Sequence, residues 1–164
     1  MAKLVVSVGI SGAGKTTFGN KLENTTIICP DDIRKELTGD ISDQSRNVEV
    51  WRIAYDRLRK SLENGEDVYF SATTLTSKSL KTLLDTVEYL KPEITIYAFE
   101  DSRDWKLCEK RVKEDLKNGV ERSNTDIKID NKPLIQSMSE KYINMVDNTL
   151  PRYYPELKVV KIRG

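Results

Sequence analysis

Residues 9–16 read Gly9-Ile10-Ser11-Gly12-Ala13-Gly14-Lys15-Thr16, the most informative segment of this chain. The segment fills every required position of the pattern G-x-x-x-x-G-K-[ST]. The glycines of this pattern let successive backbone N–H groups turn inward toward phosphate oxygens. The lysine reaches the β- and γ-phosphates, and the following hydroxyl is a ligand for Mg²⁺. The pattern therefore predicts a binding site for a nucleoside triphosphate.

The sequence on either side of this glycine loop supports that interpretation over a plain turn. Residues 3–8 form a short apolar, β-branched run that is typical of a buried strand. Residues 15–23 predict a helix whose N-terminus would face the phosphates. We therefore expect the triphosphate to be bound by Gly12, Ala13, Gly14, Lys15 and Thr16, with Thr16 also a ligand of the metal.

Apolar periodicity and turn residues predict alternating strands and helices along the rest of the chain. This alternation indicates one domain over residues 1–164 with a three-layer α/β fold, in which helices cover both faces of a mainly parallel, five-stranded sheet. Further strands are expected at 26–29, 67–71, 94–99 and 156–162, helices at 31–37, 46–64, 80–90, 103–117 and from Pro133 onward, and an exposed loop at 118–131.

Composition limits the classes of function. The 164 residues include 27 basic and 26 acidic side chains, and a net charge of +1 argues against extensive binding of duplex DNA. No apolar run approaches the roughly 18 residues of a membrane span, and no signal peptide precedes the first strand, so we expect a cytoplasmic protein without a membrane partner. Cys29 and Cys108 lack metal-ligand spacing and are expected to be reduced core thiols.

The chain also contains no histidine, so a general base would have to be a carboxylate or, less favourably, a lysine, tyrosine or thiolate. Ligands of parallel α/β folds bind at the carboxyl ends of the strands. Asp31, Asp32 and Arg34 directly follow the second predicted strand. Either aspartate could simply cap a helix, but a carboxylate here would lie across from the glycine loop, where it could activate an acceptor hydroxyl. Arg34 could hold an anionic acceptor.

Three segments together resemble the polynucleotide-kinase-like P-loop kinases, a family that includes phage polynucleotide 5′-kinases and zeta-toxin-like kinases. They are GISGAGKTT at 9–17, D-D-x-R at 31–34 and Ser-Ala-Thr-Thr-Leu at 71–75. The resemblance implies a kinase that uses ATP and Mg²⁺, with Asp31 as general base, Arg34 near the reacting phosphates and Thr17 at the α-phosphate.

The same resemblance implies a lid, expected at 111–131, whose arginines cover ATP. Arg111 matches the first lid arginine, whereas Asp115 stands where the second is expected. Lys113 or Arg122 could replace it, and an ordinary basic surface helix is the alternative interpretation of these residues.

Residues 71–74 depart from the family, because relatives carry an aspartate there and this chain has none. The threonines could begin the next helix, with Thr76 or Ser77 as its N-cap. The expected reaction is transfer of the γ-phosphate to a hydroxyl, first of all the 5′-hydroxyl of a polynucleotide or nucleotide. Two alternatives remain open: a kinase for a small molecule such as a nucleoside or another alcohol, and a nucleotide-binding module without catalysis.

Overall fold

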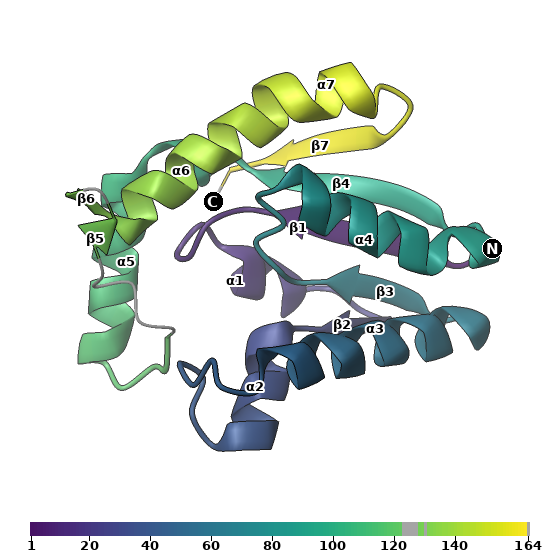
Figure 1. Cartoon of the computed structure of the whole chain (residues 1–164), viewed down its shortest axis with the longest axis horizontal. Helices are drawn as coiled ribbons and strands as arrows, with labels where there is room; N and C mark the ends of the chain where they lie inside the picture. The colour runs from purple at the N-terminus through teal and green to yellow at the C-terminus, as the bar shows by residue number, and fades with distance from the viewer. Residues whose placement is uncertain (123–127, 130, 164) are drawn as a thin grey trace.

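The computed structural model describes residues 1–122, 128–129 and 131–163, and it has the predicted α/β fold (Figure 1). Five strands form one sheet in the order β2-β3-β1-β4-β7, and every neighbouring pair is parallel. The strands are β1 (Lys3–Val8), β2 (Thr25–Ile28), β3 (Asp67–Phe70), β4 (Glu93–Phe99) and β7 (Lys158–Ile162).

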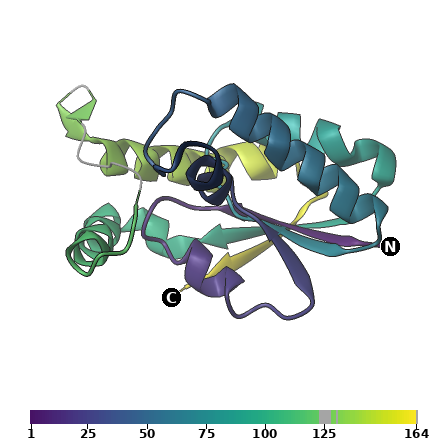
Figure 2. The same cartoon turned by 90° about the horizontal axis from the view of Figure 1, so that it is seen from below.

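Helices cover both faces of this sheet. Figure 2 shows α3, α4 and α6 over one face and α1 over the other, while α5 stands at the edge where the strands end. The helices are α1 (Lys15–Gly19), α2 (Pro30–Thr38), α3 (Asn47–Glu63), α4 (Ser77–Val87), α5 (Trp105–Lys117), α6 (Leu134–Asn144) and α7 (Leu150–Tyr153), with 3₁₀ turns at Glu88–Leu90 and Glu100–Arg103 and a π-helical turn at Met145–Thr149.

The central strand β1 explains why the sequence folds this way. Its residues Leu4, Val6 and Val8 are fully buried, and Ser7 between them is buried as well. A strand covered on both faces needs such a nearly continuous apolar run, which is what the sequence shows. Because all five strands are parallel, their carboxyl ends meet at one edge, and the glycine loop and α2 both lie there.

Helix α1 is shorter than predicted and ends at Gly19 rather than Glu23. Glycine and asparagine are weak helix formers, and the chain turns away through Asn24, which has a left-handed φ of 54°. Gly19 also packs against Tyr69, whose ring would lie 2.7 Å from a Cβ at this position. The glycine therefore sets the close approach of α1 to β3.

Several other boundaries differ from the prediction; for example, α4 covers Ser77–Val87 rather than 80–90. Helix α5 begins at Trp105 rather than Arg103, because the Asp104 carboxylate accepts the Leu107 amide and caps the helix. The expected loop at 118–131 includes a strand, since β5 (Lys128–Ile129) pairs antiparallel with β6 (Lys132–Pro133). Pro133 thus ends a strand and precedes α6, instead of lying in the first turn of that helix. Residues 123–127 and 130 of the expected lid lie outside the described residues.

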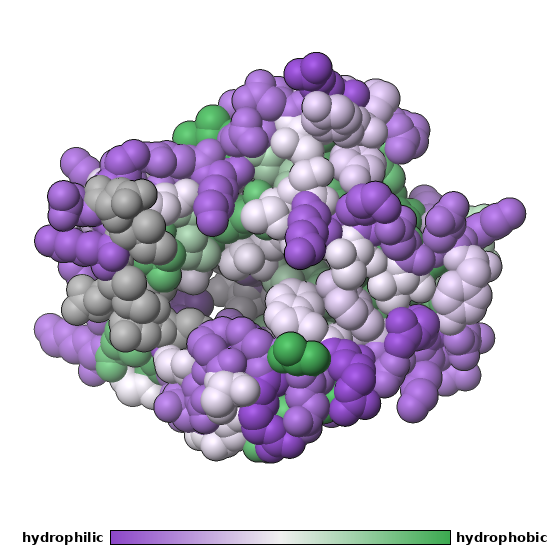
Figure 3. Space-filling view, viewed as in Figure 1, coloured by the Kyte–Doolittle hydropathy of each residue, from purple (hydrophilic) through white to green (hydrophobic). Residues whose placement is uncertain are grey.

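Polar side chains dominate the face seen in Figure 3, and hydrophobic residues appear there as isolated spots. In the described part of the chain, no helix is long and apolar enough to cross a bilayer.

Candidate active site

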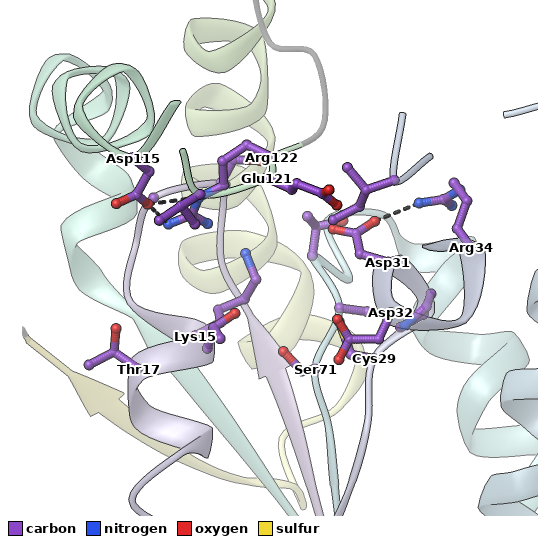
Figure 4. Close-up of a pocket in the computed structure, with 18 of the residues that line it drawn as sticks. Lys15, Thr17, Cys29, Asp31, Asp32, Arg34, Ser71, Asp115, Glu121 and Arg122 are labelled. Atoms are coloured by element: carbon purple, nitrogen blue, oxygen red, sulfur yellow. Dashed lines mark hydrogen bonds and ion pairs between the residues drawn. The ribbon is translucent and has the colours of Figure 1, made fainter. Parts of the chain in front are cut away.

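A cavity of about 500 Å³ opens at the carboxyl edge of the sheet (Figure 4). Its wall is built by the glycine loop with α1, the start of α2, the segment after β3 and the segment at 120–122. Most residues expected at the site from the sequence line it, namely Gly12, Gly14, Lys15, Thr16, Thr17, Asp31 and Arg34. Ala13 is buried and Arg111 lies elsewhere, so neither is part of the wall.

The glycine loop has the backbone that its sequence predicts. Gly12 and Gly14 have φ values of 82° and 102°, in the left-handed region that favours glycine. A Cβ on Gly12 would also meet the carbonyl oxygen of Cys108 at 2.5 Å, so the loop packs directly on the backbone of α5. The first amides of α1 have no partner within the helix and are available to phosphate oxygens.

Lys15 lies in the wall of the cavity that the glycine loop and α1 form. Its Nζ donates hydrogen bonds to the carbonyl oxygens of Gly9 at 3.0 Å and Ile10 at 2.8 Å. Burial lowers the pKa of Lys15 to about 8; Asp31 opposes this shift and the nearby Arg122 adds to it. The ammonium is therefore poorly compensated without a ligand, and a bound polyphosphate would stabilise it.

Asp31 faces Lys15 from the opposite wall, in the first turn of α2 (Figure 4). One turn later, Arg34 pairs with it, with 2.5 Å between Nη1 and Oδ1. The Nε of Arg34 donates to Asn47 Oδ1 at 3.0 Å, and the arginine is almost fully buried. The N-cap of α2 is Cys29, which makes no capping hydrogen bond through its side chain. Neither aspartate is thus the cap of this helix.

Asp32 and Cys29 occupy the same wall. Burial and the charge of Asp31 raise the pKa of Asp32, and burial raises the pKa of the Cys29 thiol. Cys108 is fully buried as predicted, but Cys29 is only half-buried and lines the cavity, so the expectation of a core thiol is wrong for Cys29.

The arginines expected in the lid take different places. Arg111 donates to the Gly12 carbonyl at 3.1 Å and pairs with Asp101 at 2.9 Å, so it supports the glycine loop from outside the cavity. Arg122 lies on the cavity wall, where its Nε donates to Asp115 at 2.8 Å. Asp115, where the resemblance led us to expect a second lid arginine, therefore holds another arginine in place through an ion pair.

Lys113 takes no part in the cavity wall, since it pairs with Glu109 at 3.3 Å on the surface of α5. Of the two residues considered as replacements for the second lid arginine, Arg122 is the one at the cavity.

The segment without a carboxylate, residues 71–74, is held to the sheet by β1. The Ser7 hydroxyl donates to the Ala72 carbonyl at 2.6 Å and accepts its amide at 2.9 Å, and the Gly9 amide donates to the Thr73 carbonyl at 3.1 Å. Ser71, Ala72 and Thr73 line the cavity. Thr76 caps α4 through the Ser79 amide, as predicted.

The side-chain oxygens of Thr16, Asp31 and Asp32 in the cavity are suitable ligands for a magnesium ion that also binds phosphate oxygens. In the described residues, no cluster of three or more histidine, cysteine, aspartate or glutamate side chains could hold a metal alone. Thr16 lines the cavity on one side and the two aspartates on the other. Mg²⁺ is commonly held by one or two such oxygen ligands together with substrate phosphates.

Besides Cys29, three wall residues were not predicted from the sequence: Ile41, Gln44 and Trp51. Trp51 is one of the apolar residues that recur at helical spacing along α3. This spacing predicts a position in the core and gives no sign of a binding site. Ile41 and Gln44 lie between α2 and α3 and carry no motif. Their place at the site depends on the tertiary arrangement of these two helices.

A comparison with protein families places most of the chain in one family. The family described as an AAA domain, AAA_33, matches residues 4–128, which include the glycine loop, Asp31, Arg34 and α5. The chain belongs to the AAA_33 family. No curated protein matches it.

Solved structures show the same fold. One chain in the Pnkp1/Rnl/Hen1 RNA repair complex is 20% identical with a TM-score of 0.65, over 93% of this chain and 46% of that one. A chain in another structure of the Pnkp1/Rnl/Hen1 complex is 25% identical with a TM-score of 0.57, over 80% of this chain and 44% of that one. A gluconokinase from Sinorhizobium meliloti 1021 is 18% identical with a TM-score of 0.51, over 98% and 82%.

The AAA_33 chain therefore has a P-loop kinase-like fold, and kinases are among its structural neighbours. It spans less than half the length of the two RNA repair chains.

Proposed function

We propose that this protein is an ATP-dependent kinase that transfers the γ-phosphate to a hydroxyl group. The observation that carries the proposal is the placement of Lys15 and Asp31 on opposite walls of one cavity. Phosphoryl transfer needs positioned phosphates, neutralised charge and a carboxylate to orient or deprotonate the nucleophile. The glycine loop, Lys15 and Asp31 would supply these three in turn.

In this reaction Lys15 and the amides of the glycine loop hold the β- and γ-phosphates, and Thr17 contacts the α-phosphate. Asp31 accepts the proton of the acceptor hydroxyl, whose oxygen bonds to the γ-phosphorus as the bond to the β-phosphate oxygen breaks. Arg34 positions Asp31 through their ion pair. Arg122 would stabilise the charge that develops on the transferred group, while Arg111 keeps the glycine loop in place.

A magnesium ion would be held by Thr16 and the phosphates, with Asp31 or Asp32 near it, and would neutralise the phosphate oxygens when bound.

The first acceptor that we propose is the 5′-hydroxyl of a polynucleotide or nucleotide. The similarity to chains of an RNA repair complex supports this acceptor, at 25% identity for one of them. The gluconokinase-like fold supports a small alcohol as the second acceptor.

Two contacts limit the space beside Asp31. Lys35 of α2 pairs with Glu121 at 2.7 Å, and the Ser42 hydroxyl donates a hydrogen bond to the Arg122 carbonyl at 3.4 Å. A strand end or a small molecule suits such a space better than a duplex.

Two substitutions test the division of roles. Lys15→Ala should abolish transfer from γ-labelled ATP, because the cavity then lacks its cation for the γ-phosphate. Asp31→Asn should lower kcat by about 100-fold or more while the Kd for ATP stays within about twofold, since a general base acts on the acceptor. Retained turnover in Lys15→Ala protein, or a loss of ATP affinity with intact turnover in Asp31→Asn protein, would contradict the proposal.

A further inference from the structure

Beyond Asp31, the cavity wall contains an aromatic ring that the transfer reaction does not use. Trp51 is partly exposed and lines the cavity from the second turn of α3. Its indole packs against Tyr55 and Phe70, with ring centroids 5.7 and 6.3 Å away. A fixed aromatic ring on a cavity wall is a stacking surface for another planar ring.

Trp51 lies on the acceptor side of the cavity. Asn47, one helical turn before it, accepts a hydrogen bond from Arg34, the partner of Asp31. Helices α2 and α3 are thereby joined at the position of the proposed general base. A ring stacked on Trp51 would therefore belong to the acceptor rather than to ATP.

Two consecutive hydrogen bonds determine which way the side-chain amide of Gln44 is oriented beside this ring. The guanidinium of Arg34 can only donate, so the side-chain atom of Asn47 that it meets is the oxygen. The amide nitrogen of Asn47 must then donate to Gln44 Oε1. Within residues 1–122, 128–129 and 131–163, the amide nitrogen of Gln44 has no protein acceptor. Gln44 thus offers hydrogen-bond donors to a ligand in the cavity.

The charges on this side favour an uncharged group. The carboxylates of Asp32 and Glu121 line the same cavity, and two nitrogens of the Arg34 guanidinium are already bonded to Asp31 and Asn47. Ile41 adds an apolar side chain to the wall. A neutral planar ring with acceptor atoms on its edge matches this surface better than a phosphate does.

We propose that the acceptor carries a nucleobase, which stacks on Trp51 and accepts a hydrogen bond from Gln44. This inference rests on the proposed kinase function, and it selects nucleosides and nucleic-acid ends over sugar-like alcohols. Every base has a flat face and at least one acceptor atom, so the site tolerates different bases.

Binding to Trp51 can be observed directly, because the chain has two tryptophans. In Trp105→Phe protein, Trp51 is the sole tryptophan, and a dinucleotide with a 5′-hydroxyl should quench its fluorescence to saturation. The matched Trp51→Phe protein, which keeps Trp105 outside the cavity, should show no quenching. Equal quenching by a dinucleotide whose 5′ residue lacks a base, or no quenching of Trp51, would overturn the proposal.

Turnover gives the second test. We compare kcat/KM for a 5′-hydroxyl dinucleotide and for the same dinucleotide with an abasic 5′ residue. Stacking on an aromatic side chain predicts a ratio of roughly 5 to 150 in favour of the base. Trp51→Leu should bring this ratio close to one, while Trp105→Leu should leave it unchanged.

Gln44→Glu provides a variant without loss of core packing, because Gln44 is exposed and the new carboxylate still accepts the Asn47 amide. Gln44→Glu should lower the ratio severalfold, because the donor to the base is lost, whereas Gln136→Glu on α6 should leave the ratio unchanged. Equal use of both dinucleotides by the unmodified protein would overturn the base site and leave the kinase intact. If neither dinucleotide is phosphorylated, the proposal of a nucleic-acid 5′-hydroxyl as acceptor fails, and the fluorescence titration alone decides on the base site.

Discussion

At the scale of single residues, the environment of Lys15 links nucleotide binding to pH. Its pKa is lowered to about 8 by burial, so in the free protein the ammonium is present below pH 8 and is lost above it. A bound polyphosphate favours the ammonium. Binding of ATP should therefore take up protons above pH 8, and its affinity should fall as pH rises, by up to about tenfold per pH unit.

Calorimetry at pH 8.5 in two buffers of different ionisation enthalpy measures this proton uptake. Lys15→Met protein should take up none in any residual binding, whereas Lys21→Met, at an exposed position, should behave as the unmodified protein does. Equal proton uptake in Lys15→Met and unmodified protein would show that another group titrates.

A second prediction at this scale concerns the effect of Gly12 on the free energy of unfolding. Gly12 and Gly39 have almost the same φ, 82° and 80°, but only at Gly12 would a Cβ meet another atom, the Cys108 carbonyl oxygen at 2.5 Å. Gly39→Ala should cost about 1 kcal/mol of unfolding free energy from backbone strain. Gly12→Ala should cost clearly more, because α5 must move away from the loop. Equal costs in urea unfolding would mean that this contact does not constrain the loop.

The candidate site residues that could be recognised from the sequence are those that lie in short sequence patterns. The glycine loop, Asp31 and Arg34 each lie within one turn or one strand end, where a short pattern determines geometry. Arg122 and Trp51 could not be placed in this way, because Arg122 reaches the cavity through Asp115, seven residues away, and Trp51 through the packing of α3 on α2.

At the scale of elements, α5 connects the glycine loop with the arginine on the cavity wall. Its Arg111 contacts Gly12, and its Asp115 holds Arg122. Asp115→Ala should release Arg122 and lower kcat by about tenfold or more, with a similar effect for Arg122→Ala. The double variant should lose no more than either single one, because both changes remove the same interaction.

Glu109→Ala is the control for this prediction, since it breaks an ion pair with Lys113 on the exposed surface of the same helix. Turnover close to that of the unmodified protein is expected. Additive losses in the double variant would show that Asp115 and Arg122 act separately.

Element order was predictable and element ends were less so. Strand and helix positions follow from apolar periodicity, which long-range packing reinforces. The early end of α1 at Gly19 depends on the Tyr69 ring, and the late start of α5 depends on the capping carboxylate of Asp104. The β5–β6 pair has only two residues in each strand, too short to show alternation in a sequence.

At the scale of the whole molecule, the parallel sheet brings segments that are distant in the sequence to one edge. The glycine loop, α2, the end of β3 and residues 120–122 meet around one cavity, which is where the central claim of a kinase site can be tested. The near balance of 27 basic and 26 acidic side chains agrees with a local site for a strand end.

The most direct measurement is phosphate transfer from γ-labelled ATP with Mg²⁺ to a parallel set of acceptors: single-stranded DNA and RNA with a 5′-hydroxyl, the same strands with a 5′-phosphate, nucleosides, nucleotides and gluconate. We predict label on the 5′-hydroxyl strands or nucleosides, none on strands that already carry a 5′-phosphate, and none with Lys15→Ala protein. Label on none of these acceptors, with ATP bound but unchanged, would contradict the account and indicate a nucleotide-binding module without catalysis.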